Sequence, residues 1–322
     1  MSRRRLLVAG AASLAWPALP AAAERTRLTL ATGSSGGGFH EHGPALAELV
    51  ARYAPIDLDL QPTTGSHDNV VLIGAGDADL GLASMGSVFD AWNGRTPFKA
   101  RGPFRNLRAL LPLYEASFGL VALRARGAAR LSDLAGATIG AGPAGGSAQM
   151  YLVGLVAALG LPVKIATGAP ADLAERVIAG EIDAFWFGSG IPVPAFAEVV
   201  ERADGVVLGL APDEIAGLRR TFPYVATGEI PAGSYKGQSS ALPSAAIWSF
   251  LIGSDRLGEA EAYETTRAVL DHAAEITGAF PRLVGASLAN VTANTFLPFH
   301  PGALRYFTDK GVIVPDALRD RG

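Results

Sequence analysis

The alternation of short strand-like runs with helical patterns constrains the fold of this chain more than any other feature of its sequence. Residues 28–31 form a short apolar run, residues 33–38 form a glycine-rich loop, and a helical spacing of apolar residues continues to residue 50. Residues 56–60 then alternate apolar and polar side chains, as a half-buried strand does. The same order recurs further along, with strands predicted at 79–84, 137–140, 163–166 and 183–187 and helices at 148–159 and 172–179.

Two sets of alternating strands and helices predict an α/β fold. Helices that connect successive strands pack on the faces of a parallel-rich sheet. The chain has 322 residues, a length that suits one large or two medium-sized domains. We therefore expect two lobes, each with a parallel-rich sheet flanked by helices.

Residues 1–23 have the order of a secretory signal peptide. Three arginines come first, an apolar stretch starts at Leu6, and small residues end at Ala23, the expected cleavage site. Pro17 and Pro20 interrupt the apolar stretch, which falls short of the ~20 residues needed to span a bilayer. The paired arginines also fit a twin-arginine signal, so Sec and twin-arginine export both stay open. We expect a soluble periplasmic protein.

Composition excludes several classes of function. The chain has no cysteine, which rules out a disulfide scaffold, a thiolate zinc site, a cysteine nucleophile and a lipid-modified N-terminal cysteine. Without residues 1–23 the chain keeps 24 basic and 30 acidic residues, a net charge of −6. This charge offers no basic excess for a nucleic-acid backbone. We expect neither a nucleic-acid partner nor a lipoprotein.

One glycine-rich loop fits the pattern GxSxG, in which a strained turn exposes a hydrolase serine. The match covers Gly33 to Gly37 and makes Ser35 the candidate nucleophile. In that fold, strands and an oxyanion loop precede the nucleophile, whereas here the motif follows the first predicted strand. The position in the chain therefore disfavours catalysis at Ser35.

A second loop, Gly140 to Gly145, reads GxGxxG between a strand and a helix and invites a flavin or NAD site. Such a site needs an acidic residue at the end of the following strand to hold the ribose hydroxyls. The strand at 163–168 reads VKIATG and ends without an acid. We expect no cofactor, and an exported oxidoreductase that uses this loop remains the alternative from a different class.

Histidines give only a weak indication of a metal site. His40 and His42 are two residues apart, which places them on different faces of a helix, and His67 is distant in sequence. The chain contains no His-Glu-x-x-His pattern. We expect no metal.

Small residues open most of the predicted helices. Each such N-terminus exposes unpaired amide donors and the positive end of the helix dipole. Loops that follow parallel strands collect at one edge of a sheet, so two facing lobes would bring these amides to a shared cleft suited to a small anion. The candidate segments are residues 36–39, 66–69, 86–87, 145–147 and 168–172.

Several of these segments resemble one family. The stretches LTLATGSSGGGFHEHGPALAELV and TTGSHDNVVLIGAGDADLGLASMGSVFDAWNG look like the TAXI (TRAP-associated extracytoplasmic immunogenic) solute receptors. The resemblance continues through SDLAGATIGAGPAGGSA, GEIDAFWFGSGIP and LPFHPGALRYFTDKGV. Their order and spacing span nearly the whole chain after residue 23.

The resemblance implies a two-lobe type II periplasmic binding protein of the Venus-flytrap kind rather than an enzyme. Such a receptor closes on a small organic anion, such as glutamate or a dicarboxylate, and delivers it to a TRAP membrane permease. An ABC-system or sensor-kinase receptor of the same fold remains a further alternative. The resemblance places ligand contacts on Ser34, Ser35, Gly37, Phe39, His40, Ser66, Asn69, Ser84, Ser147 and Phe187.

Two details complete the expectation. Phe39 and His40 stand where the family usually has paired tyrosines, which replaces phenol hydroxyls by an imidazole. The chain should cross between lobes near residues 110–121 and 225–247. Lobe 1 would then hold residues 24–115 and 240–322, and lobe 2 would hold residues 116–239.

Overall fold

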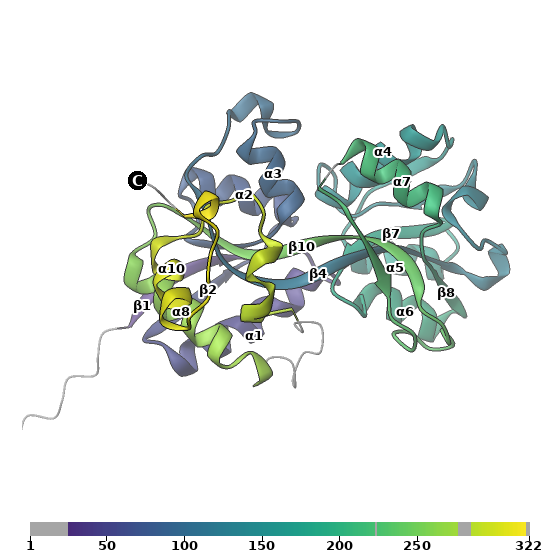
Figure 1. Cartoon of the computed structure of the whole chain (residues 1–322). Coiled ribbons are helices and arrows are strands. Elements are labelled where there is room, and N and C mark those ends of the chain that lie inside the picture. The colour runs from purple at the N-terminus through teal and green to yellow at the C-terminus, as the bar shows by residue number, and fades with distance from the viewer. Residues whose placement is uncertain (1–24, 223, 276–284, 320–322) are drawn as a thin grey trace, which may run out of the picture.

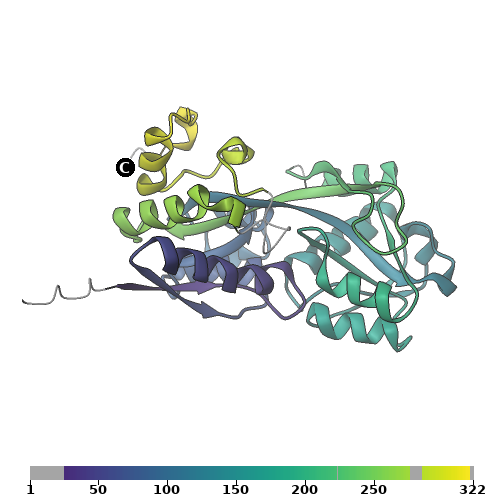
Figure 2. The ribbon, with the colours of Figure 1, turned by 90° about the horizontal axis from the view of Figure 1, so that it is seen from below.

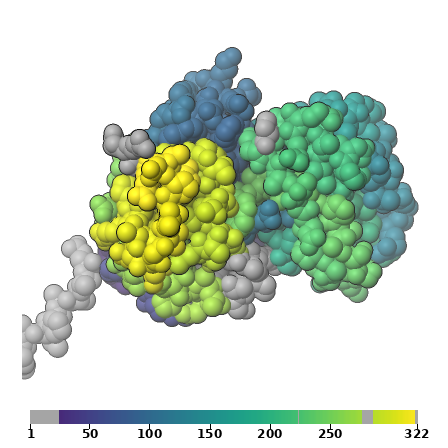
Figure 3. All heavy atoms as spheres, viewed as in Figure 1, coloured from purple at the N-terminus to yellow at the C-terminus, as the bar shows by residue number. Residues whose placement is uncertain are grey.

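The computed structural model describes residues 25–222, 224–275 and 285–319. The predicted signal peptide, residues 1–23, lies outside the described residues. The described chain forms two bodies of mixed strands and helices, joined by two long strands (Figure 1). The space-filling view shows the same division, with the C-terminal segment in yellow on one body and the central segment in teal and green on the other (Figure 3).

The first body, called lobe 1 below, combines the N-terminal strand–helix units with the C-terminal helices. Its elements before the first crossing are β1 (Thr26–Ala31), α1 (Gly38–Tyr53), β2 (Ile56–Gln61), α2 (Ser66–Ala75), β3 (Leu80–Ser84), α3 (Met85–Trp92) and η1 (Phe98–Arg101). Its elements after the second crossing are α8 (Glu259–Asp271), η5 (Leu288–Ala293), α10 (Pro301–Asp309) and η6 (Asp316–Leu318).

The second body, lobe 2, holds the middle of the chain. Its elements are η2 (Arg124–Arg126), η3 (Leu131–Leu134), β5 (Thr138–Gly140), α4 (Ser147–Leu159), β6 (Lys164–Ala166), α5 (Pro170–Ile178), β7 (Ala184–Ser189), α6 (Pro194–Arg202), β8 (Gly205–Leu208), α7 (Pro212–Thr221) and β9 (Ala226–Ile230).

Two long strands, β4 (Leu107–Leu123) and β10 (Leu242–Ser254), run antiparallel through both lobes. In lobe 1, β10 pairs with β3, and in lobe 2 β4 pairs with β7 and β8. The described strands therefore form one continuous sheet of order β2-β1-β3-β10-β4-β7-β5-β6 rather than two separate sheets. Residues 242–246 of β10 still pair with β9, so the second crossing lies later than residue 240.

The parallel pairs lie at the two ends of this sheet, where β1 pairs with β2 and β3, and β5 pairs with β6 and β7. Helices flank both faces of the sheet. In lobe 1, α1 and α8 pack side by side on the leucines of one face (Figure 2), whereas α2 and α3 cover the other. In lobe 2, α4 and α7 cover one face and α5 and α6 the other. The prediction of a parallel-rich α/β sheet flanked by helices is confirmed.

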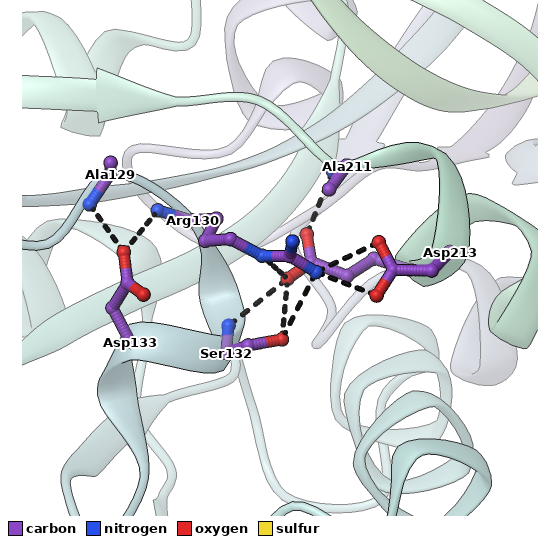
Figure 4. Close-up of polar contacts among 7 residues, drawn as sticks. Ala129, Arg130, Ser132, Asp133, Ala211 and Asp213 are labelled. Atoms are coloured by element: carbon purple, nitrogen blue, oxygen red, sulfur yellow. Dashed lines mark hydrogen bonds and ion pairs between the residues drawn. The ribbon is translucent and has the colours of Figure 1, made fainter.

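A polar network fixes α7, the helix that packs against α4. The guanidinium of Arg130 donates to both carboxylate oxygens of Asp213, at 2.8 and 2.7 Å (Figure 4). The fully buried Glu214 accepts from Arg130 Nε at 3.3 Å and from the Ser132 amide at 3.0 Å. Its other oxygen accepts from the Ala211 amide and so caps α7. A buried carboxylate without such partners would be costly, so these bonds hold the start of α7 to η3.

No helix among residues 25–222, 224–275 and 285–319 is long and apolar enough to cross a membrane.

Candidate functional site

A pocket of about 60 Å³ lies between the two lobes. Its lining residues come from the loops and helix starts that follow β1, β2, β3 and β5, from the end of β7 and from the crossing strands β4 and β10. Loops after parallel strands gather at the carboxyl edge of a sheet, which explains why residues far apart in the chain meet here. Among the described residues that line the pocket, none is Asp, Glu, Lys, Arg or His.

The N-termini of four helices reach this pocket. Gly37 precedes α1, Gly65 precedes α2 and Gly146 precedes α4, and no side chain caps any of these three helices. Ser84 precedes α3, and its hydroxyl accepts from the Gly86 amide at 3.3 Å. All four residues or their immediate neighbours line the pocket. Uncapped helix N-termini present amide donors and partial positive charge, so the described lining offers hydrogen-bond donors although none of its residues is basic.

Hydroxyl groups supply the remaining polar lining. Tyr114 on β4 lies directly across the strand pair from Ser249 on β10, and the Ser189 hydroxyl also lies beside the Tyr114 phenol. Burial raises the pKa of Tyr114, and its hydrogen bonds with the two serines oppose that shift only in part. The phenol therefore stays neutral, able both to donate and to accept a hydrogen bond.

Aromatic rings form the apolar part of the wall. Phe39 and Phe187 both line the pocket, as does Phe118. The Phe187 ring lies beside both Gly37 of lobe 1 and Gly142 of lobe 2, so it fills the space where the two lobes meet. Phe118 is stacked on Trp186, with ring centroids 5.2 Å apart. The pocket thus joins polar helix ends to a flat apolar surface.

Within the described parts of the chain, hydrogen bonds connect one lobe directly to the other at three places. His67 Nδ1 lies 2.6 Å from the Gly145 carbonyl oxygen, the Ala171 amide donates to the Ser35 carbonyl oxygen at 3.3 Å, and the Tyr224 hydroxyl donates to Asp90 Oδ2 at 2.9 Å. A carbonyl oxygen only accepts, so His67 carries its hydrogen on Nδ1. These bonds define a closed arrangement of the lobes around the pocket.

The structure brings seven of the ten predicted ligand contacts to this pocket. Three others do not line it: Ser35 is exposed and uses its backbone in the lobe contact, His40 is half-buried, and Asn69 is fully buried. The seven lining residues are Ser34, Gly37, Phe39, Ser66, Ser84, Ser147 and Phe187.

The family resemblance implied that Asn69 contacts the ligand. Instead, its amide nitrogen donates to the Thr32 and Leu82 carbonyl oxygens, at 2.6 and 2.7 Å, and its oxygen accepts from the Thr63 hydroxyl at 2.7 Å. These partners lie just after β1, within β3 and in the loop before α2. Asn69 therefore holds together the backbone that carries the pocket.

Both glycine motifs have a packing role in the structure. In the GxGxxG loop, a Cβ at Gly140 would lie 2.9 Å from the Leu173 side chain, which shows how closely the strand and helix approach. The carbonyl oxygen of Gly145, the last glycine of that loop, accepts the hydrogen bond from His67. In the GxSxG loop, Gly36 has φ +78° and lies against the backbone of Ala171. The two motifs thus meet the opposite lobe.

The lining residues that the sequence reasoning missed include Tyr114, Tyr151 and Ser249. A signal for Tyr151 existed, because it lies four residues after Ser147 and so shares its face of α4. No local signal marked Tyr114 or Ser249, since the pairing of β4 with β10 alone brings them together.

No group of three or more His, Asp or Glu side chains suited to a metal ion occurs in the described part of the chain.

Solved structures with the same architecture place the fold in a known class. MatC from Rhodopseudomonas palustris with bound malate has a TM-score of 0.59 and 12% identity, covering 91% of this chain and 97% of that chain. The periplasmic binding protein BugD has a TM-score of 0.59 and 12% identity, covering 89% and 94%. At these identities the likeness shows the fold alone, and the predicted two-lobe periplasmic binding-protein fold is confirmed.

A family model identifies the family of this chain. Residues 30–311 match the model of the NMT1-like family, and this chain belongs to that family.

Proposed function

We propose that this protein is an exported substrate-binding protein that captures a small organic anion between its lobes. The observation that carries the proposal is the meeting of four helix N-termini, three of them without a side-chain cap, at one pocket between the lobes. Amide donors and hydroxyls can hold a carboxylate there, and the aromatic wall can cover its carbon skeleton. Binding, rather than catalysis, is the activity proposed.

Opening and closing about β4 and β10 would admit and retain the ligand. We propose that lobe 1 and lobe 2 move as units, because only these two strands continue through both lobes in the described residues. The three hydrogen bonds between the lobes would then break on opening and re-form on closure.

The delivery partner is proposed from the sequence resemblance to TAXI receptors, which implies a TRAP permease. MatC, solved with bound malate, and the periplasmic binding protein BugD have the same fold, which supports a role in binding a small molecule. A permease gene beside the gene for this protein would support the proposal. A neighbouring ABC cassette or sensor kinase would instead favour the alternative receptors.

A thermal-shift screen tests the binding function. Carboxylates of three to six carbons, with choline as a cationic control, are added to the purified protein. A ligand at 100 times its Kd stabilises the folded state by about 2.7 kcal/mol, which corresponds to a rise in Tm of roughly 5–10 °C. A panel in which no carboxylate raises Tm would contradict the proposal. Absorbance of a bound flavin would favour the oxidoreductase alternative.

Acidic pH is expected to weaken ligand binding through His67. Burial lowers the pKa of His67 below 6.5, although the Gly145 carbonyl and the nearby Asp68 act in the opposite direction. In an open form His67 would be exposed, and its pKa would be nearer 6.5. Protonation of His67 therefore favours opening. Affinity should be full above about pH 6.5 and fall by up to about tenfold per pH unit below it, until the lowered pKa is passed.

Calorimetric titrations at pH 7.5 and 5.5 measure this effect with the strongest carboxylate of the screen. His67→Gln is the matched variant, because its amide can donate to Gly145 without titrating. An equal pH dependence in the variant and the natural protein would show that another group is responsible.

A further inference from the structure

One buried hydroxyl in the pocket wall makes no hydrogen bond within the described residues. It belongs to Tyr151, whose side chain is 1% exposed and which lines the pocket from α4. The side chains of Tyr224 and Ser84 lie near it and partly oppose the effect of burial on its pKa, but neither has the geometry of a hydrogen bond to its oxygen. A buried hydroxyl without a hydrogen-bond partner costs free energy. The closed pocket therefore contains an unsatisfied hydrogen-bond donor.

Packing fixes the position of this hydroxyl. The Tyr151 ring makes edge-to-face contacts with Phe118 and Phe222, at centroid distances of 5.2 and 4.9 Å. Its hydroxyl also lies over Gly86 at the start of α3. The ring cannot turn to reach another protein partner without losing these contacts. Burial raises the pKa of Tyr151, so the hydroxyl keeps its proton and remains a donor.

The charge of the pocket wall restricts the ligand further. None of the described residues that line the pocket has an acidic side chain to pair with an ammonium group. Glu115 follows Tyr114 in β4 but points to the opposite face of the sheet, as successive strand residues do, and it is exposed. Asp90 accepts a hydrogen bond from the Tyr224 hydroxyl and does not line the pocket. A buried ammonium without a carboxylate is strongly unfavourable.

We propose that Tyr151 is a specificity-determining residue that donates a hydrogen bond to an oxygen of the bound acid, and that the pocket accepts organic acids without an ammonium group. This inference rests on the proposed binding function and narrows its ligand class. It disfavours glutamate, which the family resemblance implied, and favours 2-oxo acids, 2-hydroxy acids and simple carboxylates of similar size.

Two matched ligand series test the ligand class. One series is pyruvate, L-lactate, propionate and L-alanine; the other is 2-oxoglutarate, 2-hydroxyglutarate, glutarate and L-glutamate. Within each series only the substituent at the second carbon changes. Calorimetric titration should find that an amine-free acid binds at least about tenfold more tightly than its amino-acid partner, since an unpaired buried charge is costly. Tighter binding of alanine or glutamate would overturn the inference but leave the proposed function standing. Absence of binding in both series would overturn both.

Variants test the role of Tyr151. Tyr151→Phe keeps the ring contacts and removes the hydroxyl, so affinity for the tightest acid should fall about 10- to 100-fold, as for loss of a hydrogen bond to a charged group. Tyr306→Phe is the matched control: Tyr306 is also buried, but its hydroxyl donates to Asp271 on the far side of lobe 1. Affinity should be unchanged in that control. Unchanged affinity in Tyr151→Phe, with a natural melting curve, would remove Tyr151 from the site.

Discussion

Gly86→Ala is expected to weaken ligand binding by about 5- to 150-fold while leaving the ligand-free protein as stable as before. Gly86 lies in the first turn of α3 in lobe 1. A Cβ there would overlap the Tyr151 hydroxyl and lie 2.5 Å from the Tyr224 ring, and both tyrosines belong to lobe 2. Overpacking of this kind costs about 1–3 kcal/mol, which corresponds to the stated range of affinities.

The expected separation of affinity from stability follows from where the overlap occurs. An open form would remove the tyrosines from Gly86, so the added methyl would meet no strain there. Alanine in a helix is even favoured over glycine by about 0.5–1 kcal/mol. Calorimetric titration with the strongest acid of the screen and a melting curve of the ligand-free protein measure the two quantities.

Gly217→Ala is the control for Gly86→Ala. Gly217 lies within α7 and does not line the pocket, and a Cβ there would be 3.3 Å from the Leu159 side chain of the same lobe. The affinity of the Gly217→Ala variant for the ligand should equal that of the natural protein. If Gly86→Ala also bound normally, the close fit of α3 against the tyrosines would not be needed for binding.

Asn69→Ala is expected to lower the free energy of unfolding by about 3 kcal/mol, because two buried carbonyl oxygens and the half-buried Thr63 hydroxyl lose a hydrogen bond. The Thr32 and Leu82 carbonyls and the Thr63 hydroxyl now pair with this one side chain. In a chain of this size the loss corresponds to a decrease in Tm of roughly 6–12 °C. Urea denaturation measures the change.

Asn93→Ala provides the comparison for Asn69. Asn93 also donates from its side-chain amide to a backbone carbonyl, that of Phe89 at 2.8 Å, but it is exposed. Water replaces such a bond readily, so the variant should lose less than about 0.5 kcal/mol. Normal stability combined with weak ligand binding in Asn69→Ala would instead support the role that the sequence had suggested.

Local patterns predicted the individual strands and helices well, because alternation and helical spacing depend on neighbouring residues. The helix predicted at 148–159 is observed as Ser147–Leu159, and the strand predicted at 163–166 as Lys164–Ala166. The sequence predicted a crossing between the lobes near residues 110–121, but it did not show that residues 107–123 form a single strand that both lobes share. That strand is defined by pairing with distant segments, which no local pattern records.

The candidate site divides in the same way. Glycine and serine at helix starts indicated the segments that contain Gly37, Ser66 and Ser147, since the signal for an N-terminus is local. Asn69 looked identical in kind, but its burial beneath the loop depends on how β1 and β3 approach each other. The sequence pattern therefore identified the loops that meet the pocket better than the side chains that point into it.

The crossing strands have a consequence for how affinity can change in such a protein. Tyr114 and Ser249 line the pocket and also lie on β4 and β10, at the place where these strands pass from one lobe to the other. A bound ligand would thus contact the crossing strands about which the lobes are proposed to move. Substitutions at these two positions should alter the resting balance between open and closed forms together with the contacts to the ligand. Ligand selectivity and the rate of ligand release then depend on the same side chains. A substitution that changes one of them should also change the other.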